Sequence, residues 1–302
     1  MLWVGQGILA AVVAYFVWHS LSAQWDEFRS LELDLTIRVL PVVGAALIVL
    51  AVYTVLIGAW WAVLRGWKQQ LRYRDAVRIW SVSNLGRYLP GKVWSVAGLA
   101  ALAQRAGVSA WAAVGSAIAM QALAVASGVG VVAAMLPGVA SPIQLGAVGL
   151  VAVTVLVVLM SPRVGEAIAR AIRSRRTYHP LPVGVGLLAY SMTVLSWMAY
   201  GVAFWLLAHG VIDEPALPLR LAIGVFAGGY IVGLLAIFAP GGIGVREFVY
   251  IAALTPSLGV GGAIVVSVAS RLLLTATEII AALVGLTLGA RTTERSVDSG
   301  QR

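Results

Sequence analysis

The sequence predicts an all-α polytopic membrane protein, and two observations support this class. Of its 302 residues, 61% are hydrophobic and only 11% are charged, a balance that soluble globular domains do not have. Its apolar runs reach about 18 residues or more, enough for a helix to cross the roughly 30 Å hydrocarbon core of a bilayer. Runs of this length are typical of membrane helices and not of barrel strands. We expect about six full spans and two re-entrant helical hairpins in the cell membrane.

The charges between the apolar runs orient the first two expected spans, 2–19 and 39–64. The loop between these spans is net acidic. The loop after the second span is strongly basic and carries Arg65, Lys68, Arg72, Arg74 and Arg78 against Asp75. Because positive residues gather in cytoplasmic loops, we expect the basic loop and the amino terminus to be cytoplasmic.

A polar, helix-breaking motif interrupts the next apolar region, 79–105. It contains Asn84, Arg87, Tyr88, Pro90, Gly91 and Lys92. A Pro-Gly pair removes one backbone donor and loosens the chain, and irregular backbone at membrane depth is tolerated only against protein or a watery cavity. Since the loops on both sides are expected to be cytoplasmic, residues 79–105 are predicted to enter and leave the membrane on the same face.

The remaining expected spans are 108–136, 143–160, 183–209 and 259–290, with a cytoplasmic tail at 291–302. A second break precedes the last span and contains Pro240, Gly241, Gly242, Gly244, Arg246 and Glu247. If the tail is cytoplasmic, residues 219–255 form a second re-entrant hairpin, which enters from the external side. In the alternative topology, 219–239 is a full span and 240–255 is a cytoplasmic loop or a crossing.

The two breaks are separated by about half of the chain. Pro90-Gly91 and Pro240-Gly241 lie 150 positions apart in a chain of 302 residues. This spacing favours an inverted-topology repeat, whose site lies at the repeat interface near the middle of the membrane. We therefore expect one transmembrane domain over 1–302, with repeats 1–138 and 139–290 and with both termini in the cytoplasm.

Seven ionisable residues fall outside the expected loops and are the candidates for a functional site. They are Arg87, Lys92, Arg105, Arg246, Glu247, Arg271 and Glu278. Charges inside a membrane span are costly, and they mark either function or internal ion pairs. Arg271, Thr275 and Glu278 lie on one helix face because their spacing is i, i+4 and i+7. This face either forms an internal ion pair or offers Arg271 to an anionic headgroup and Glu278 to a proton or a cationic group.

Arginine at each of the two breaks suggests phosphate recognition. A half-helix that begins after Pro240-Gly241-Gly242 directs its positive end at the cavity, and a guanidinium fork binds phosphate in a bidentate manner. Arg87 and Arg246 are therefore the strongest candidates for headgroup ligands. Asn84 and Tyr88 either supply neutral hydrogen bonds beside Arg87 or satisfy the backbone freed at the hairpin.

Several other functions are not expected. The net charge of +9 belongs to loops between spans, so nucleic-acid binding is not expected. The sequence has no cysteine, and its histidines, His19, His179 and His209, lack metal-ligand spacing, so no metal and no cofactor is expected. It contains no phosphate-binding loop and no catalytic constellation, so we expect neither an ATPase nor another enzymatic activity.

The two breaks read Asn84-x-x-Arg87-Tyr88-x-Pro90-Gly91-Lys92 and Ala239-Pro240-Gly241-Gly242-Ile243-Gly244-Val245-Arg246-Glu247. In these motifs the chain resembles the lysylphosphatidylglycerol synthase transmembrane-region family, which includes the flippase half of the multiple peptide resistance factor. The resemblance implies a flippase-like fold that moves phospholipids or polyprenyl-linked lipids between leaflets. Because the sequence ends at residue 302 without a soluble aminoacyl-transferring domain, lysine transfer is not expected, and a separate lipid-modifying enzyme is a candidate partner.

These expectations combine into a mechanism in which Arg87, Lys92 and Arg246 hold a lipid phosphate near the midplane while its tails stay in the bilayer. Glu247 or Glu278 is expected to exchange a proton as one repeat rocks against the other. Two alternatives are a membrane transferase that uses one of these acids, and a scaffold whose charges pair with one another. The lipid headgroup, the direction and energy source of transport, and the oligomeric state stay open.

Overall fold

The computed structural model describes residues 37–88, 93–136, 181–236 and 239–298, together with isolated positions between 154 and 170. Within these ranges it contains seven α-helices, two short 3₁₀ helices and no strand, so the predicted all-α class is confirmed. The predicted span 2–19, the predicted span 143–160 apart from Thr154, and the motif residues Pro90, Gly91 and Lys92 lie outside the described residues.

Four helices contain an apolar stretch long enough to cross a membrane in the part of the chain that the structure describes. They are α2 (Val39–Gly66), α5 (Ala110–Met135), α8 (Val183–Val211) and α10 (Val245–Asp298). The predicted spans 39–64, 108–136 and 183–209 agree with the first three of these helices to within two residues at each end. Long, uninterrupted apolar runs therefore predicted these helices well.

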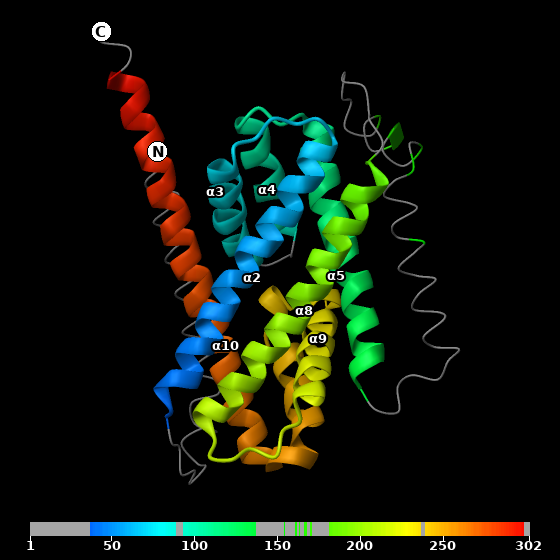
Figure 1. The fold of residues 1–302 in the computed structure, drawn as a ribbon, viewed down its shortest axis with the longest axis vertical. Helices are drawn as coiled ribbons and strands as arrows, with labels where there is room; N and C mark the ends of the chain where they lie inside the picture. The colour runs from blue at the N-terminus through cyan, green and yellow to red at the C-terminus, as the bar shows by residue number, and fades with distance from the viewer. Residues whose placement is uncertain are drawn as a thin grey trace.

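Helix α10 differs from its predicted span, 259–290. It begins at Val245 and is interrupted at Gly259, which has φ 68° and ψ 168°, a conformation essentially limited to glycine. The interruption divides α10 into a short arm (245–258) and a long arm (260–298), which run in opposite directions (Figure 1). The long arm continues through the predicted tail to Asp298, because no proline follows residue 259 to stop it.

Two short helices form the first helix–break–helix unit. Helices α3 (Tyr73–Asn84) and α4 (Val93–Arg105) pack against each other, and the 3₁₀ turn η1 (Leu85–Tyr88) extends the first of them. With 12 and 13 residues, the helices are about 18 and 20 Å long, too short to cross the hydrocarbon core. The predicted start at residue 79 was wrong, since α3 begins six residues earlier with Asp75 in its first turn, where a carboxylate is favourable.

The second helix–break–helix unit is built from α9 (Leu219–Leu235), the 3₁₀ turn η2 (Pro240–Gly242) and the short arm of α10. Helix α9 has 17 residues and is about 26 Å long. Gly241, Gly242 and Gly244 have φ values of 58°, 72° and 81°. Only glycine adopts such values without steric cost, so this glycine-rich motif is what lets the chain turn back at the predicted break.

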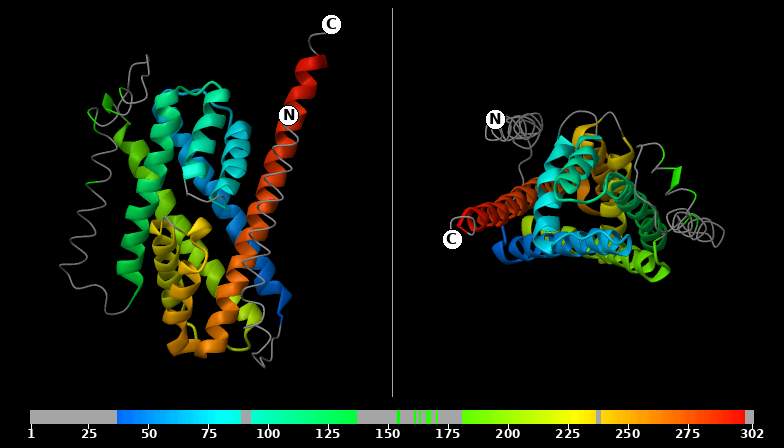
Figure 2. Two further views of the ribbon diagram at one scale, coloured as in Figure 1. Left: turned by 180° about the vertical axis from the view of Figure 1, so that it is seen from behind. Right: turned by 90° about the horizontal axis from the view of Figure 1, so that it is seen from above.

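The two 3₁₀ turns, η1 and η2, meet near the middle of the molecule (Figure 1). The first unit occupies one end and the second unit the other, while α2, α8 and the long arm of α10 run past both (Figures 1 and 2). Turns η1 and η2 are in contact, and Gly241 faces Tyr88 and the main chain of Arg87 at ordinary packing distance. The arrangement therefore brings the two predicted motifs together, although they lie far apart in the sequence.

Close packing of α9 depends on its small residues. A Cβ atom on Gly229 would lie 2.3 Å from Cε1 of Tyr250, so the ring of the short arm rests directly on the α9 backbone. Tyr250 is 1% exposed and packs with Phe204 and Phe226 in the core around the second unit. A second core surrounds the first unit and includes Trp60 and Trp111.

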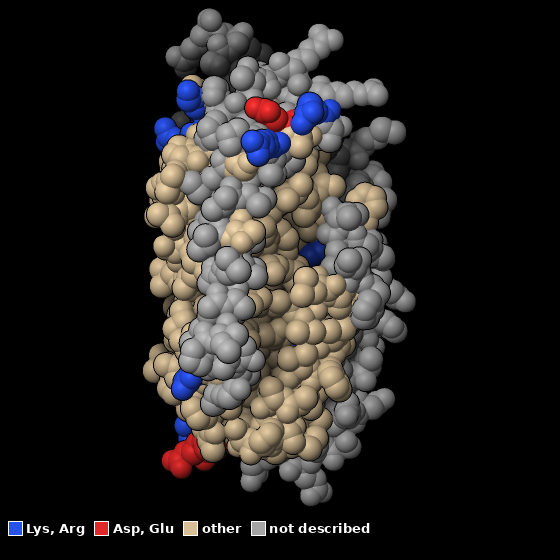
Figure 3. All heavy atoms as spheres, turned by 90° about the vertical axis from the view of Figure 1, so that its right-hand side faces the viewer, with Lys and Arg blue, Asp and Glu red and all other residues tan. Residues whose placement is uncertain are grey.

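The outer surface separates charged ends from a broad apolar middle (Figure 3). The end that holds the α2–α3 loop carries Arg65, Lys68, Arg72, Arg74, Arg78 and Arg105 against Asp75. The opposite end carries Arg38 and Arg220 against Asp213 and Glu214, and Arg38 forms a salt bridge with Asp213. An apolar band between two charged ends is the surface expected of a protein that crosses a membrane.

Candidate functional site

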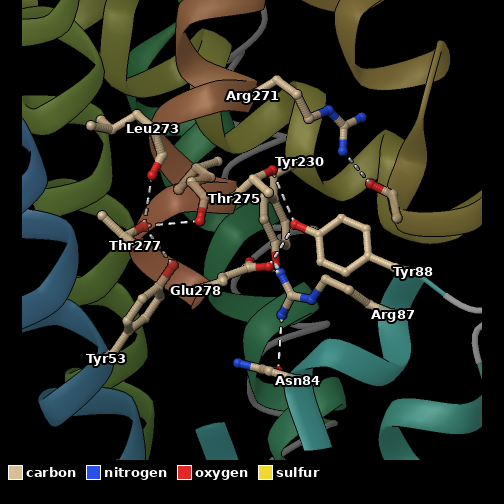
Figure 4. Close-up of polar contacts among 12 residues, drawn as sticks. Tyr53, Asn84, Arg87, Tyr88, Tyr230, Arg271, Leu273, Thr275, Thr277 and Glu278 are labelled. Atoms are coloured by element: carbon tan, nitrogen blue, oxygen red, sulfur yellow. Dashed lines mark hydrogen bonds and ion pairs between the residues drawn. The ribbon is translucent and has the colours of Figure 1, made fainter. Parts of the chain in front are cut away.

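Five ionisable side chains gather where the two helix–break–helix units face the long arm of α10. Figure 4 shows three of them, Arg87, Arg271 and Glu278. We call this group the central cluster, and it consists of Arg87, Arg246, Glu247, Arg271 and Glu278. With three arginines and two glutamates, it carries a net charge of +1 when all five are ionised. Arg105, the other described candidate, is exposed at the end of α4 and does not belong to the cluster.

The first ion pair connects η1 to the long arm. Nη1 of Arg87 donates a hydrogen bond of 2.7 Å to Oε1 of Glu278, and Nη2 donates one of 3.0 Å to Oδ1 of Asn84. The hydroxyl of Tyr88 donates to Oε2 of Glu278 at 2.8 Å and lies 3.2 Å from Oγ1 of Thr275. In this structure the side chains of Asn84 and Tyr88 therefore bind the ion pair itself, Asn84 through Arg87 and Tyr88 through Glu278.

The second ion pair connects the short arm to the long arm. Nε of Arg271 donates to Oε1 of Glu247 at 2.8 Å, and its Nη2 lies 2.6 Å from the same oxygen. Nη1 of Arg271 donates to the carbonyl of Gly241 at 3.2 Å, which fixes the η2 turn. The other oxygen of Glu247 accepts the backbone N–H of Gly244 at 2.7 Å and so caps the start of α10.

Arg271 and Glu278 share a helix face as predicted, but they are paired with other residues. Arg271 binds Glu247 of the second unit, whereas Glu278 binds Arg87 of the first. The internal pairing that the sequence left as one alternative is present, and it connects the long arm separately to each break. A phosphate that binds Arg87 or Arg271 has to compete with a carboxylate that is already in place.

Unlike Arg87 and Arg271, Arg246 has no carboxylate partner among the described residues. Its residue exposure is 6%, and within the described ranges it forms no salt bridge and no hydrogen bond. Its guanidinium carbon lies 5.4 Å from the ring centroid of Tyr230, a cation–π contact. A guanidinium that is buried without a direct hydrogen-bonding partner is costly, so an anion that enters the cluster would satisfy Arg246 without displacing a carboxylate from it.

Several residues of this site were missed by sequence reasoning. The hydroxyl of Tyr230 accepts a hydrogen bond of 3.0 Å from Nη1 of Arg87 while its ring faces Arg246, so Tyr230 contacts two arginines. Tyr53 of α2 lies 3.2 Å from the hydroxyl of Thr277, next to the first ion pair. A signal for Tyr230 was present, because it is the only hydroxyl-bearing side chain in α9.

The described helices and the charged interior define an integral, multi-pass α-helical membrane protein. The chain belongs to the family described as the Lysylphosphatidylglycerol synthase TM region, whose family model matches residues 2–285. The predicted resemblance is therefore confirmed, and it associates the chain with the modification and translocation of membrane lipids. A comparison with curated proteins found no match.

Proposed function

We propose that this protein is a flippase, which moves phosphate-bearing lipids between the two leaflets of the cell membrane. The observation that carries the proposal is Arg246, a buried guanidinium that lacks a counter-ion and a hydrogen bond among the described residues. Spontaneous lipid flipping is slow because a bare phosphate loses its hydration in the hydrocarbon core. A buried arginine has also lost its hydration. A charge-assisted hydrogen bond between the phosphate and Arg246 therefore offsets part of the desolvation penalty of both groups.

The geometry of the breaks supports a pathway of this kind. Helices α3, α4 and α9 are all shorter than the hydrocarbon core is thick, and the breaks that follow α3 and α9 meet at mid-height. We propose that the two helix–break–helix units are re-entrant hairpins from opposite faces and form an inverted repeat, as the break spacing predicts. The strongly basic end around the α2–α3 loop would then be cytoplasmic.

Introduced thiols test this topology directly, because the chain has no cysteine of its own. Arg74→Cys, at the basic end, is expected to react with a membrane-impermeant maleimide from the cytoplasm only. Ser257→Cys, at the turn between the two arms of α10, is expected to react from the outside only. Cytoplasmic labelling of both variants would contradict the inverted repeat.

The two alternatives are less well supported. A transferase needs a free acid or base, but Glu247 and Glu278 each accept hydrogen bonds from an arginine and serve as counter-ions. A scaffold is compatible with both ion pairs, but it gives no reason to bury Arg246 without a partner. Product formation by the purified protein with a lipid-linked sugar donor would favour the transferase.

A leaflet-resolved assay in proteoliposomes tests the flippase proposal. Fluorescent phosphatidylglycerol, its aminoacylated form and a polyprenyl phosphate are each followed by quenching with an impermeant reductant. Arg246→Gln is expected to slow transport by about tenfold or more, since a charge-assisted hydrogen bond contributes about 1.5–3 kcal/mol. Arg74→Gln, which changes an exposed arginine on α3, is the matched control. Transport by Arg246→Gln at the wild-type rate would refute the site, and no transport of any lipid would refute the function.

A further inference from the structure

The two carboxylates of the central cluster are held in different ways. Glu247 binds the backbone N–H of Gly244 at the start of its own helix, where the positive helix end favours a charged carboxylate. Glu278 lies in the middle of the long arm, and its described hydrogen bonds come only from the side chains of Arg87 and Tyr88. Release of Glu278 therefore breaks no backbone contact, whereas release of Glu247 uncaps a helix.

The arginine that holds Glu278 is the accessible one. The side chain of Arg87 is 26% exposed, compared with 9% for Arg271. A lysine or arginine side chain is visible at the bottom of a recess midway along the apolar surface (Figure 3). Tyr230 contacts Arg87 through its hydroxyl and Arg246 through its ring. An anion that reaches Arg246 is therefore separated from Arg87 by one side chain, that of Tyr230.

Among the described residues, no cation other than Arg87 forms a hydrogen bond or salt bridge with Glu278. The hydroxyl of Tyr88 from η1 contacts Glu278 directly, and the hydroxyl of Tyr230 from α9 contacts Arg87. Tyr53 from α2 and Tyr200 from α8 are close enough to interact with Glu278 electrostatically, and Thr275 and Thr277 of the long arm bind Tyr88 and Tyr53. A carboxylate that loses its sole cationic partner in a low-dielectric interior is neutralised most readily by a proton.

We infer that Glu278 is an exchangeable counter-anion, which the lipid phosphate displaces from Arg87 and which then takes up one proton. The inference rests on the proposed flippase function. In this step the ion pair between Arg87 and Glu278 breaks, an O–H bond forms on Glu278 with a proton from water, and the phosphate takes the place of the carboxylate. The number of charges in the central cluster is unchanged by the exchange.

The exchange has a consequence for the energy source of transport. A lipid with one negative charge and one proton move together, so the loaded cluster carries the same net charge as the empty one. A pH gradient is then expected to bias the direction of lipid movement, whereas a membrane potential is not. Glu278→Gln removes the titrating group, so its transport is expected to lose the response to pH and to gain a response to potential.

Proton uptake on lipid binding is the direct test. Purified protein in weakly buffered detergent near neutral pH is titrated with dihexanoylphosphatidylglycerol in the presence of a pH-indicating dye. The wild type and the control Glu214→Gln, an exposed carboxylate at the far end, are expected to take up close to one proton for each lipid bound. Glu278→Gln is expected to bind the lipid without proton uptake, and the titratable variant Glu278→Asp is expected to retain the uptake.

The outcomes separate the inference from the function on which it rests. Lipid binding by the wild type without proton uptake overturns the exchange and leaves the flippase proposal intact. Uptake by Glu278→Gln at the wild-type level also overturns it, because another group is then titrating. Failure of the wild type to bind the lipid at all contradicts the proposed phosphate recognition and the inference with it. Lipid binding by Glu278→Gln shows that this variant is folded, and retained uptake in Glu278→Asp assigns the proton to a carboxylate at this position.

Discussion

Replacement of two buried arginines by methionine is expected to change stability in different directions. Arg271→Met leaves Glu247 charged and 5% exposed, with only the Gly244 N–H as a partner. Breaking a buried ion pair in this way costs about 3–5 kcal/mol of the free energy of unfolding. Both partners are almost fully buried, so solvent screening does not reduce this cost.

Arg246→Met is expected not to destabilise the protein, because Arg246 forms no salt bridge in the described part of the chain and its loss leaves no carboxylate unpaired. The substitution loses a cation–π contact with Tyr230, about 0.5–2 kcal/mol. It also removes the desolvation penalty of an unpaired ion, which is several kcal/mol. Stability is therefore expected to stay unchanged or to rise by up to about 3 kcal/mol, while transport is lost.

Equilibrium unfolding in mixed micelles with increasing dodecyl sulfate, followed by far-ultraviolet circular dichroism, measures both effects. Arg74→Met, on the exposed face of α3, controls for the loss of a surface arginine. An Arg246→Met variant that is as unstable as Arg271→Met would refute the reasoning, because Arg246 would then be paired in the folded protein. That result would also favour the scaffold alternative.

Substitutions at three further positions test the packing and the site. Gly229→Ala places a methyl group 2.3 Å from the buried ring of Tyr250 and is expected to lower the free energy of unfolding by about 1–3 kcal/mol in the same titration. Gly241 has φ 58°, so Gly241→Ala is expected to lower the free energy of unfolding by about 1–2 kcal/mol. Gly241→Asn is expected to lower it less, since asparagine tolerates this conformation, and equal losses would argue against backbone strain. Tyr230→Phe keeps the ring but removes the hydrogen bond from Arg87, so proteoliposome transport is expected to fall several-fold, and to fall further in Tyr230→Leu.

The long helices were predictable because each is a continuous apolar run, but the first hairpin was predicted to begin too late. Arg74 and Arg78 look like loop residues in the sequence, because a basic cluster follows the second span. In the structure both are exposed residues on α3, whose other face is buried through Ala76 and Ile79. Apolar residues at helical spacing among the charges were the signal that would have placed the start at Tyr73.

The sequence predicted where the candidate site lies but not which carboxylate binds which arginine. Proline and glycine mark both breaks directly, and the glycines of η2 do adopt positive φ values. Which carboxylate binds which arginine depends on contacts between residues that are 191 positions apart in one case and 24 in the other. One sequence contains no information about such distances, so Arg87 and Arg246 were equivalent candidates until the fold showed that, of these two, Arg87 has a carboxylate partner among the described residues and Arg246 has none.

The ion pair between Arg87 and Glu278 also sets an order for the biogenesis of this protein. The ribosome makes Arg87 191 residues before its carboxylate partner. During that interval the guanidinium of η1 has no described counter-ion, and an arginine at the centre of a bilayer costs at least about 2.5–3.5 kcal/mol. If the first helix–break–helix unit is re-entrant, as proposed, it is expected to wait at the membrane interface or within the insertion machinery. It reaches its final depth only when the carboxyl-terminal helix has entered the membrane.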